Sequence, residues 1–323
     1  MSTPSLGLKA ARHPFADADA DIVLRSSDNV DFHVHRLILS KASPVFSDIL
    51  TIPSSASDPD ASDQPPNVDE LKDGIPIVRM AENQAVLDTI LRLSYPTDKP
   101  SISSDLSFVR ALVRAMDKYA MIMTFPQTLE SVMLEAAAVQ PFAVYAIACQ
   151  YRMFEIANRI ARISLLHPLD FSSSQLITED YDLMTSSQYH QLLRYRHQSA
   201  AAVLEPIQSL KRLQPLDIPG IKPQPSCTCS VLSRFNEAIR YPPAYALRRV
   251  SLYLERCEAT LRSRPHSDTV LDDSIILPSI LDAPRCSACQ SSTNELRLFS
   301  RNLEKKFRSA LETVQPPFPA AVP

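Results

Sequence analysis

The spacing of short apolar strands near the start of the chain constrains its fold most. Residues 21–24 form one strand, Ser26 to Asp31 is a polar turn, and a second strand follows from Phe32. A third strand is predicted at residues 74–78, where Pro76 indicates the edge of a sheet because proline has no amide hydrogen for the ladder. These segments predict a small three-stranded sheet.

Helices follow the strands in a regular order. Ser43 is placed to cap a helix that begins at Pro44, since a serine oxygen accepts a hydrogen bond from the first helical turn and proline fits the first helical position. Asn83 caps another helix, which Tyr95-Pro96 stops. Apolar spacing predicts the remaining helices. Two of them begin at about Leu37 and at Pro126, and the others cover residues 108–119, 141–148, 154–166, 187–213 (interrupted near Pro206), 244–264 and 293–314.

The same periodicity predicts which side chains of the first domain form its core. The expected core residues are Phe32, Val34, Leu37, Leu39, Phe46, Leu50, Val86, Ile90, Leu112 and Met116.

Polar and proline-rich stretches separate these elements. Residues 52–73 are rich in Ser, Asp and Pro and cannot bury enough apolar surface to fold, so we expect a disordered insertion. Four prolines between residues 215 and 225 indicate a linker. Residues 1–17 and 316–323 are expected to be flexible tails.

The opening of the chain resembles a BTB/POZ domain. The residues that carry the resemblance are Asp21, Phe32, His35, Arg36, Ser43 and Phe46, in that order. The resemblance implies an α+β fold, with a small three-stranded sheet flanked by helices, followed by a mainly α-helical extension. It also implies that Asp21 and Arg36 form a partly buried charged pair. No strand or helix of the kind that such domains exchange in dimers is evident before Asp19.

The whole chain also resembles BTB-domain proteins of basidiomycete fungi, which carry a C-terminal helical region containing cysteines. The expected organisation is therefore a tail (1–17), a BTB/POZ-like domain (18–137), a helical extension (138–213), a linker (214–225), a C-terminal helical region (226–315) and a second tail (316–323).

Two close cysteine pairs are the strongest metal-binding signal. Cys227 and Cys229 precede the arginine-rich helix, and Cys286 and Cys289 follow it. Four thiolates complete a closed tetrahedral zinc site, and a two-helix region with a small core would gain stability from one. We therefore expect one structural zinc ion, with Cys257 and His266 as substitute ligands. The alternative is that all four are reduced thiols with packing roles.

Composition argues against several classes of function. The chain has three glycines, Gly7, Gly74 and Gly220, which is too few for a glycine-rich phosphate loop. A net charge of −3 gives no strong field toward nucleic acid. No nucleophile elbow, paired-carboxylate motif or kinase signature is present. We therefore expect no enzymatic activity, no membrane span and an intracellular location, in the cytoplasm or nucleus.

The leading hypothesis is a protein-protein interaction module that associates with itself or binds a partner. One version is an adaptor for a cullin-based ubiquitin ligase, which would be contacted through the helices at Leu87–Tyr95 and Phe108–Tyr119. The alternative is a nuclear, DNA-associated factor that uses the arginine-rich helix and a zinc-binding region. His33, His35, His190 and His197 are expected to be structural or solvated rather than ligands.

Overall fold

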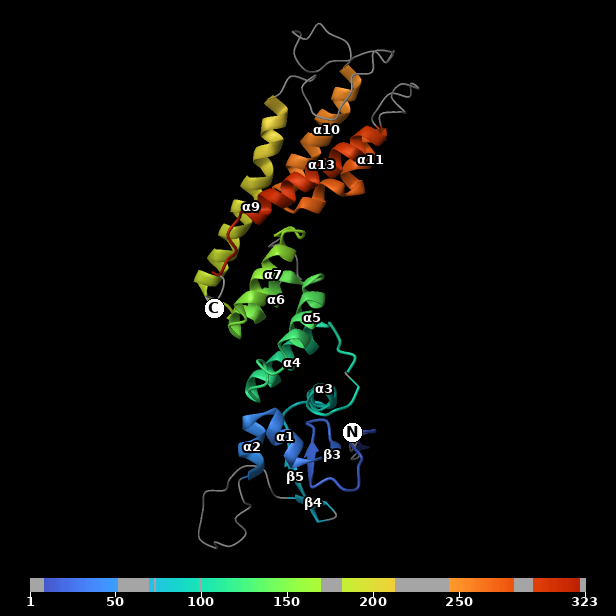
Figure 1. The fold of residues 1–323 in the computed structure, drawn as a ribbon, viewed down its shortest axis with the longest axis vertical. Coiled ribbons are helices and arrows are strands. Elements are labelled where there is room, and N and C mark those ends of the chain that lie inside the picture. The colour runs from blue at the N-terminus through green and yellow to red at the C-terminus, as the bar shows by residue number, and fades with distance from the viewer. Residues whose placement is uncertain are drawn as a thin grey trace, which may run out of the picture. The chain divides into compact units, whose positions relative to one another are not determined.

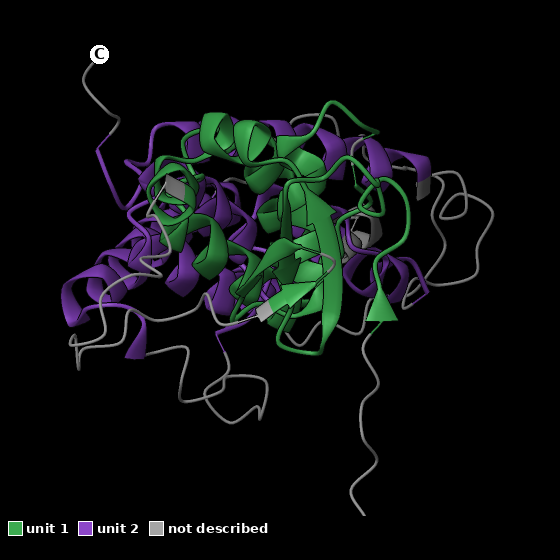
Figure 2. Ribbon diagram, turned by 90° about the horizontal axis from the view of Figure 1, so that it is seen from below, with its two compact units in different colours: residues 1–139 green, residues 140–323 purple. Residues whose placement is uncertain are grey.

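The computed structural model describes residues 9–51, 70–72, 74–98, 100–169, 182–212, 244–281 and 293–319. The chain divides into two compact units, residues 1–139 and residues 140–323 (Figure 2).

The first unit is built on a five-stranded sheet with the order β1-β3-β2-β5-β4 (Figure 1). Its strands are β1 (Lys9–Ala10), β2 (Ile22–Arg25), β3 (Val30–Val34), β4 (Glu70–Lys72) and β5 (Ile75–Arg79). β2 pairs antiparallel with β3 and parallel with β5, and these are the three predicted strands. The two edge strands were not predicted, because segments of two and three residues are too short to show an alternating pattern.

The N-terminal segment is part of this unit, so the flexible tail predicted for residues 1–17 is wrong from Lys9 onward. β1 pairs in parallel with β3 of the same chain, so a short strand precedes Asp19. Phe15 is completely buried. Its ring lies 5.7 Å from that of Phe32 and 5.4 Å from that of Tyr95, measured between centroids. One apolar side chain in a polar stretch therefore ties the segment to the core.

The structure also corrects two expectations around β5. Residues 70–72 were assigned to the disordered insertion but form β4, which pairs antiparallel with β5. Residues 52–69 lie outside the described residues. β5 has a neighbour on each side, so Pro76 does not mark a sheet edge. Pro76 precedes the stretch Ile77–Arg79 that is in register with β2, so its missing amide hydrogen does not interrupt that ladder.

The helices of the first unit begin where their caps predict. They are α1 (Arg36–Ala42), α2 (Pro44–Thr51), α3 (Gln84–Ser94), α4 (Leu106–Lys118) and α5 (Pro126–Ala137). The Ser43 hydroxyl accepts a hydrogen bond from the Phe46 amide at 3.1 Å, and the Asn83 side chain accepts one from the Val86 amide at 3.0 Å. Both predicted N-caps are confirmed.

The predicted core of this unit is confirmed except at Leu37. The other nine residues are buried, whereas Leu37 is 68% exposed. α1 is seven residues long and buries Leu39. Since residues two apart on a helix point about 200° from one another, burying Leu39 turns Leu37 toward solvent.

The second unit is helical. It contains α6 (Pro141–Gln150), α7 (Phe154–Ser164), α9 (Ser186–Arg212), α10 (Ala244–Leu261), a 3₁₀ helix η2 (Ser267–Leu271), α11 (Asp273–Leu281) and α13 (Thr293–Glu312). α9 continues through Pro206, where an interruption was expected. η2 and α11 were not predicted, because they are short and α11 contains Pro278.

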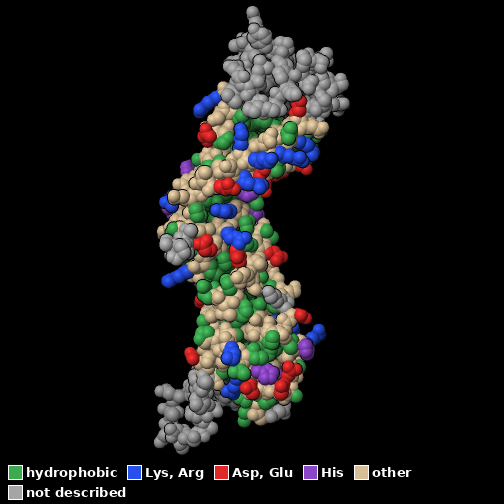
Figure 3. Space-filling model, in the orientation of Figure 1, with side chains coloured by type: hydrophobic (Ala, Val, Ile, Leu, Met, Phe, Trp, Pro, Cys, Tyr) green, Lys and Arg blue, Asp and Glu red, His purple; other side chains and the backbone are tan. Residues whose placement is uncertain are grey.

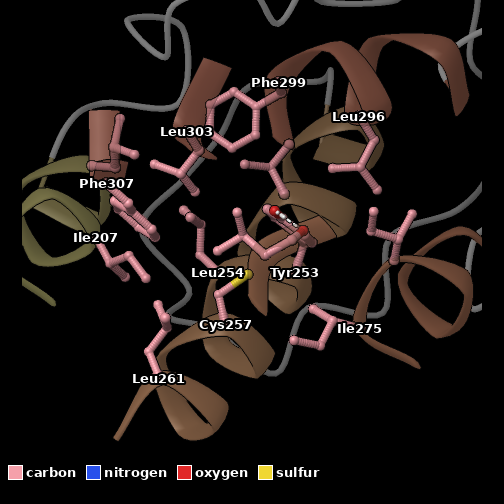
Figure 4. Packing of buried hydrophobic residues seen from close by; sticks show 14 of the residues in the cluster. Ile207, Tyr253, Leu254, Cys257, Leu261, Ile275, Leu296, Phe299, Leu303 and Phe307 are labelled. Atoms are coloured by element: carbon pink, nitrogen blue, oxygen red, sulfur yellow. Dashed lines mark hydrogen bonds between the residues drawn. The ribbon is translucent and has the colours of Figure 1, made fainter. Parts of the chain in front are cut away.

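One apolar core joins α9, α10, α11 and α13, and it corrects the predicted division between residues 138–213 and 226–315. Val203, Ile207 and Leu210 of α9 share this core with residues of the later helices. Figure 4 shows Tyr253, Leu254 and Cys257 of α10 among residues from α9, η2, α11 and α13; the cluster also contains Val250, Leu261, Val270, Ile275, Ile276, Leu296, Phe299, Leu303 and Phe307. The later helices therefore have a larger core than expected, and the proposed zinc ion is not needed to replace one.

Candidate interaction surface

Two contacts position α1, one with α2 and one with the residue that precedes β2. The Arg36 guanidinium donates to the carbonyl of Leu50, at the end of α2, at 2.8 Å. The Asp21 carboxylate accepts a hydrogen bond from the Arg36 amide, also at 2.8 Å. An exposed carboxylate thus satisfies one of the open amides at the start of α1, a position that also favours negative charge.

These contacts differ in kind from the side-chain pair that the resemblance implies. Asp21 and Arg36 lie together as expected, but the hydrogen bond between them involves the Arg36 main chain. The Arg36 side chain reaches the other helix instead. The two residues therefore position the α1–α2 pair.

Each helix of the α1–α2 pair exposes one large apolar side chain. Leu37 of α1 and Ile49 of α2 are 68% and 39% exposed, while Leu39, Phe46 and Leu50 of the same helices are buried. We call Leu37 and Ile49 the α1–α2 surface. The buried residues fix the orientation of both helices, so the two exposed side chains are presented by a rigid support.

A buried ionic cluster in the sheet was missed by sequence reasoning. Asp31 has no exposed side-chain surface. Its carboxylate accepts from the Arg25 Nε at 2.6 Å, from the Arg25 Nη2 at 3.1 Å and from the Lys72 Nζ at 2.8 Å. Burial by itself raises the pKa of Asp31, but the hydrogen bonds and charges of Arg25 and Lys72 outweigh it and hold that pKa below its ordinary value.

The sequence indicates one of the two ion pairs of this cluster, that between Arg25 and Asp31. Arg25 and Asp31 flank the turn symmetrically and face each other in the β2–β3 register. Opposite charges at facing positions of a hairpin stabilise it. Asp31 was instead assigned to the polar turn, which would have left it in solvent.

The histidines occupy structural or solvated positions, as expected. His35 precedes α1; its amide donates to the Tyr95 hydroxyl at 2.6 Å, and its Nδ1 lies 3.2 Å from the same oxygen. His33 is half-buried, and His190 and His197 are exposed.

A second polar junction joins α2, α4 and the loop before α3. The Ser43 hydroxyl donates to the Tyr119 carbonyl at 2.6 Å, and the Tyr119 hydroxyl donates to Glu82 at 2.5 Å. The Phe46 and Tyr119 rings stack with 4.5 Å between centroids. Burial raises the pKa of the Tyr119 hydroxyl, so it stays protonated and remains a donor.

The two helices expected to contact a cullin are mainly packing elements. Leu87, Ile90 and Leu91 of α3 are buried, as are Val109, Leu112, Val113 and Met116 of α4. The residues that α4 exposes in its last turn are polar: Arg114, Asp117 and Lys118. A partner at this position would meet charged side chains.

The four cysteines of the predicted zinc site, Cys227, Cys229, Cys286 and Cys289, lie outside the described residues. Among the residues that the structure does describe, no group of three or more His, Cys, Asp or Glu side chains could hold a metal ion.

The two substitute ligands have other surroundings. Cys257 is completely buried in the apolar core, and this burial raises the pKa of its thiol to about 12, which opposes the thiolate that a metal requires. The His266 Nδ1 accepts the Asp268 amide at 3.1 Å and caps η2. Both residues therefore serve the packing of the helical unit.

Three arginines of the segment predicted as an arginine-rich helix (residues 244–264) make contacts within the chain. Arg262 pairs with Glu258 at 2.8 Å, and Arg264 with Asp272 at 2.9 Å. Arg256 donates to the Ser279 hydroxyl at 2.8 Å. Arg240 lies outside the described residues. Figure 3 shows both basic and acidic side chains on the visible face.

Comparison with known families matches residues 14–72 to the BTB/POZ domain. Comparisons with curated proteins and with solved structures gave no significant match. Within the described residues, no helix is both long and apolar enough to cross a membrane. The matched segment contains β2, β3, α1 and α2, which present the α1–α2 surface. The first unit therefore carries a BTB/POZ domain, a protein-protein interaction module, and a mostly helical region follows it.

Proposed function

We propose that the BTB/POZ unit associates with a second copy of this chain through the α1–α2 surface. The observation that carries the proposal is the 68% exposure of Leu37 on a helix whose orientation is fixed by buried Leu39 and by the Arg36–Leu50 contact. A large aliphatic side chain held rigidly in solvent gains free energy when a partner covers it.

The test is the molar mass of the full chain, measured by size-exclusion chromatography with light scattering over a range of concentrations. We expect a dimer for the wild type and a monomer for Leu37→Asp. Met123→Asp is the matched control, because Met123 is an 86% exposed apolar residue of the same unit outside α1 and α2. A wild type that stays monomeric at every concentration, or a Leu37→Asp chain that remains dimeric, would contradict the proposal.

A narrower version of this function is an adaptor for a cullin. The exposed, charged end of α4 leaves a polar surface accessible to such a partner. The test is co-elution of the full chain with a purified cullin N-terminal domain, together with an Arg114→Glu variant. A complex that the variant abolishes supports this version, and separate elution of the wild type rejects it.

A further inference from the structure

The segment that follows α13 is anchored on α6 and α7. Phe318 is only 7% exposed. Its ring lies 4.5 Å from that of Phe154, on α7, and 6.3 Å from that of Tyr145, on α6, measured between centroids. The expectation of a loose tail over residues 316–323 is therefore wrong up to Pro319.

Asn158 of α7 holds the main chain of the same residue at two points. Its side-chain nitrogen donates to the Phe318 carbonyl at 3.1 Å, and its side-chain oxygen accepts from the Phe318 amide at 3.0 Å. Asn158 is itself buried, so these two bonds satisfy an amide that burial would otherwise leave costly. Such a pair recognises the main chain of a residue, whatever its side chain, and here the chain bends at Pro317 and Phe318.

We call Tyr145, Phe154 and Asn158 the aromatic–amide site. It combines a surface for one aromatic ring with a two-point contact to the peptide that carries the ring. This is how folded domains bind short extended peptides, with main-chain bonds for affinity and a side-chain contact for specificity.

The residues around Phe318 suit such a peptide. Pro316, Pro317 and Pro319 have no amide hydrogen and favour an extended chain, which lowers the conformational entropy lost on binding. Thr313, Gln315 and Pro319 are exposed, whereas Pro317 is buried beside Phe318, so the segment is held mainly at these two residues. Phe154 remains 37% exposed and leaves one side of the site open to solvent.

We propose that the aromatic–amide site binds, in trans, a segment of a partner protein with one aromatic side chain between prolines, and that residues 315–319 occupy the site in cis as a competitor. The site lies in the helical unit, so the proposal does not depend on the α1–α2 surface.

The test uses the full chain and a fluorescent peptide with the sequence of residues 313–319. Phe318→Ala removes the ring from the site and leaves the sequences of α6 and α7 unchanged, so the cis segment keeps only its main-chain bonds to Asn158 and competes weakly. We expect this variant to bind the peptide saturably by fluorescence anisotropy. The wild type should bind at least about tenfold more weakly, because its own segment competes at a high effective concentration.

Two controls distinguish specific binding of the peptide at this site from non-specific binding. The double variant Phe318→Ala/Asn158→Leu keeps the branching and the number of heavy atoms of side chain 158 but removes the amide pair, and it should lose binding. A peptide with alanine in place of its phenylalanine should also fail to bind Phe318→Ala. Equal binding by either control would overturn the proposal, as would a folded Phe318→Ala chain that does not bind the original peptide.

Thermal unfolding gives a second measurement should Phe318→Ala lose structure. A ligand that binds only the folded state raises the melting temperature, so the phenylalanine peptide should restore stability to this variant in a concentration-dependent way, and the alanine peptide should not. Absence of any restoration contradicts the proposal.

Discussion

The two units of this chain hold their buried polar groups in different ways. In the BTB/POZ unit, the buried carboxylate of Asp31 is neutralised by two cations, Arg25 and Lys72. In the helical unit, Arg196 of α9 is buried and donates instead to main-chain carbonyls, those of Ser164, His167 and Ser263.

The carbonyls around Arg196 lie at or just beyond the ends of helices. Ser164 is the last residue of α7, and Ser263 follows α10 by two residues. Helix carboxyl ends carry partial negative charge, so they stabilise a cation without a carboxylate. Desolvation nevertheless lowers the pKa of Arg196 to about 10, which leaves it charged at neutral pH. Asp31 thus relies on ion pairs between strands, and Arg196 relies on helix ends.

Among the substitutions that test this comparison, removal of Asp31 should lower the free energy of unfolding most. Asp31→Ala removes the buried carboxylate that the Arg25 and Lys72 cations share, and we expect a loss of about 3–5 kcal/mol in the free energy of unfolding. Asp17→Ala, at an exposed position of the same unit, should change it by less than about 0.5 kcal/mol. Urea unfolding followed by circular dichroism measures both. Equal stability of the two variants would mean that the cluster adds nothing.

The core of the BTB/POZ unit gives the next largest effect. Leu39→Ala removes a completely buried side chain and should cost about 2–5 kcal/mol. Leu37→Ala, two residues away on the same helix, should stay within about 0.5 kcal/mol because Leu37 is exposed. Thermal unfolding distinguishes the two. Similar melting temperatures would contradict the orientation of α1.

Arg196 tests the helical unit. Arg196→Met leaves several buried carbonyls without a donor and should cost about 1–3 kcal/mol. Arg194→Met, on an exposed face of α9, is the matched control and should be close to neutral. Arg196→Lys keeps the charge but not the planar fork of donors, so its stability should fall between them. A fully stable Arg196→Met chain would show that the helix ends do not need this cation.

Acid should act on the BTB/POZ unit through Asp31. The folded-state pKa of Asp31 lies below its ordinary value of 3.8, so its stabilising contribution is present above that pH and is lost as the pH falls through the lowered pKa. Asp31→Asn removes this titration, and its stability should change less than that of the wild type between about pH 5 and about pH 1. Parallel pH dependence of the two chains in urea unfolding would refute the assignment.

Metal removal should have the smallest effect. We keep as a proposal that Cys227, Cys229, Cys286 and Cys289 bind one structural zinc ion. Elemental analysis of chain purified without chelator should find about one zinc per chain, lost in Cys286→Ser/Cys289→Ser. Because α9, α10, α11 and α13 already share an apolar core, chelation should lower the melting temperature only slightly. A folded, metal-free wild type would reject the site.

The sequence determined the elements that depend on neighbouring residues. Ser43 and Asn83 cap their helices through hydrogen bonds to amides three residues later, and such contacts are written in local spacing. The same is true of the β2–β3 hairpin, of the helix periods and of the BTB/POZ resemblance, which the family match over residues 14–72 confirms.

Only the tertiary structure decided the contacts between distant residues. Asn158 meets Phe318 across 160 positions, Lys72 reaches Asp31 across 41, and α9 shares a core with helices beyond residue 244. The local sequence pattern does not indicate which distant residues come into contact. From the sequence, a phenylalanine among prolines is predicted to lie in a flexible tail, and an aspartate beside a turn is predicted to be solvated. In the folded chain both side chains are buried. Burial of a side chain is a property of the whole fold, and for that reason Phe15, Asp31 and Phe318 were placed by the structure alone.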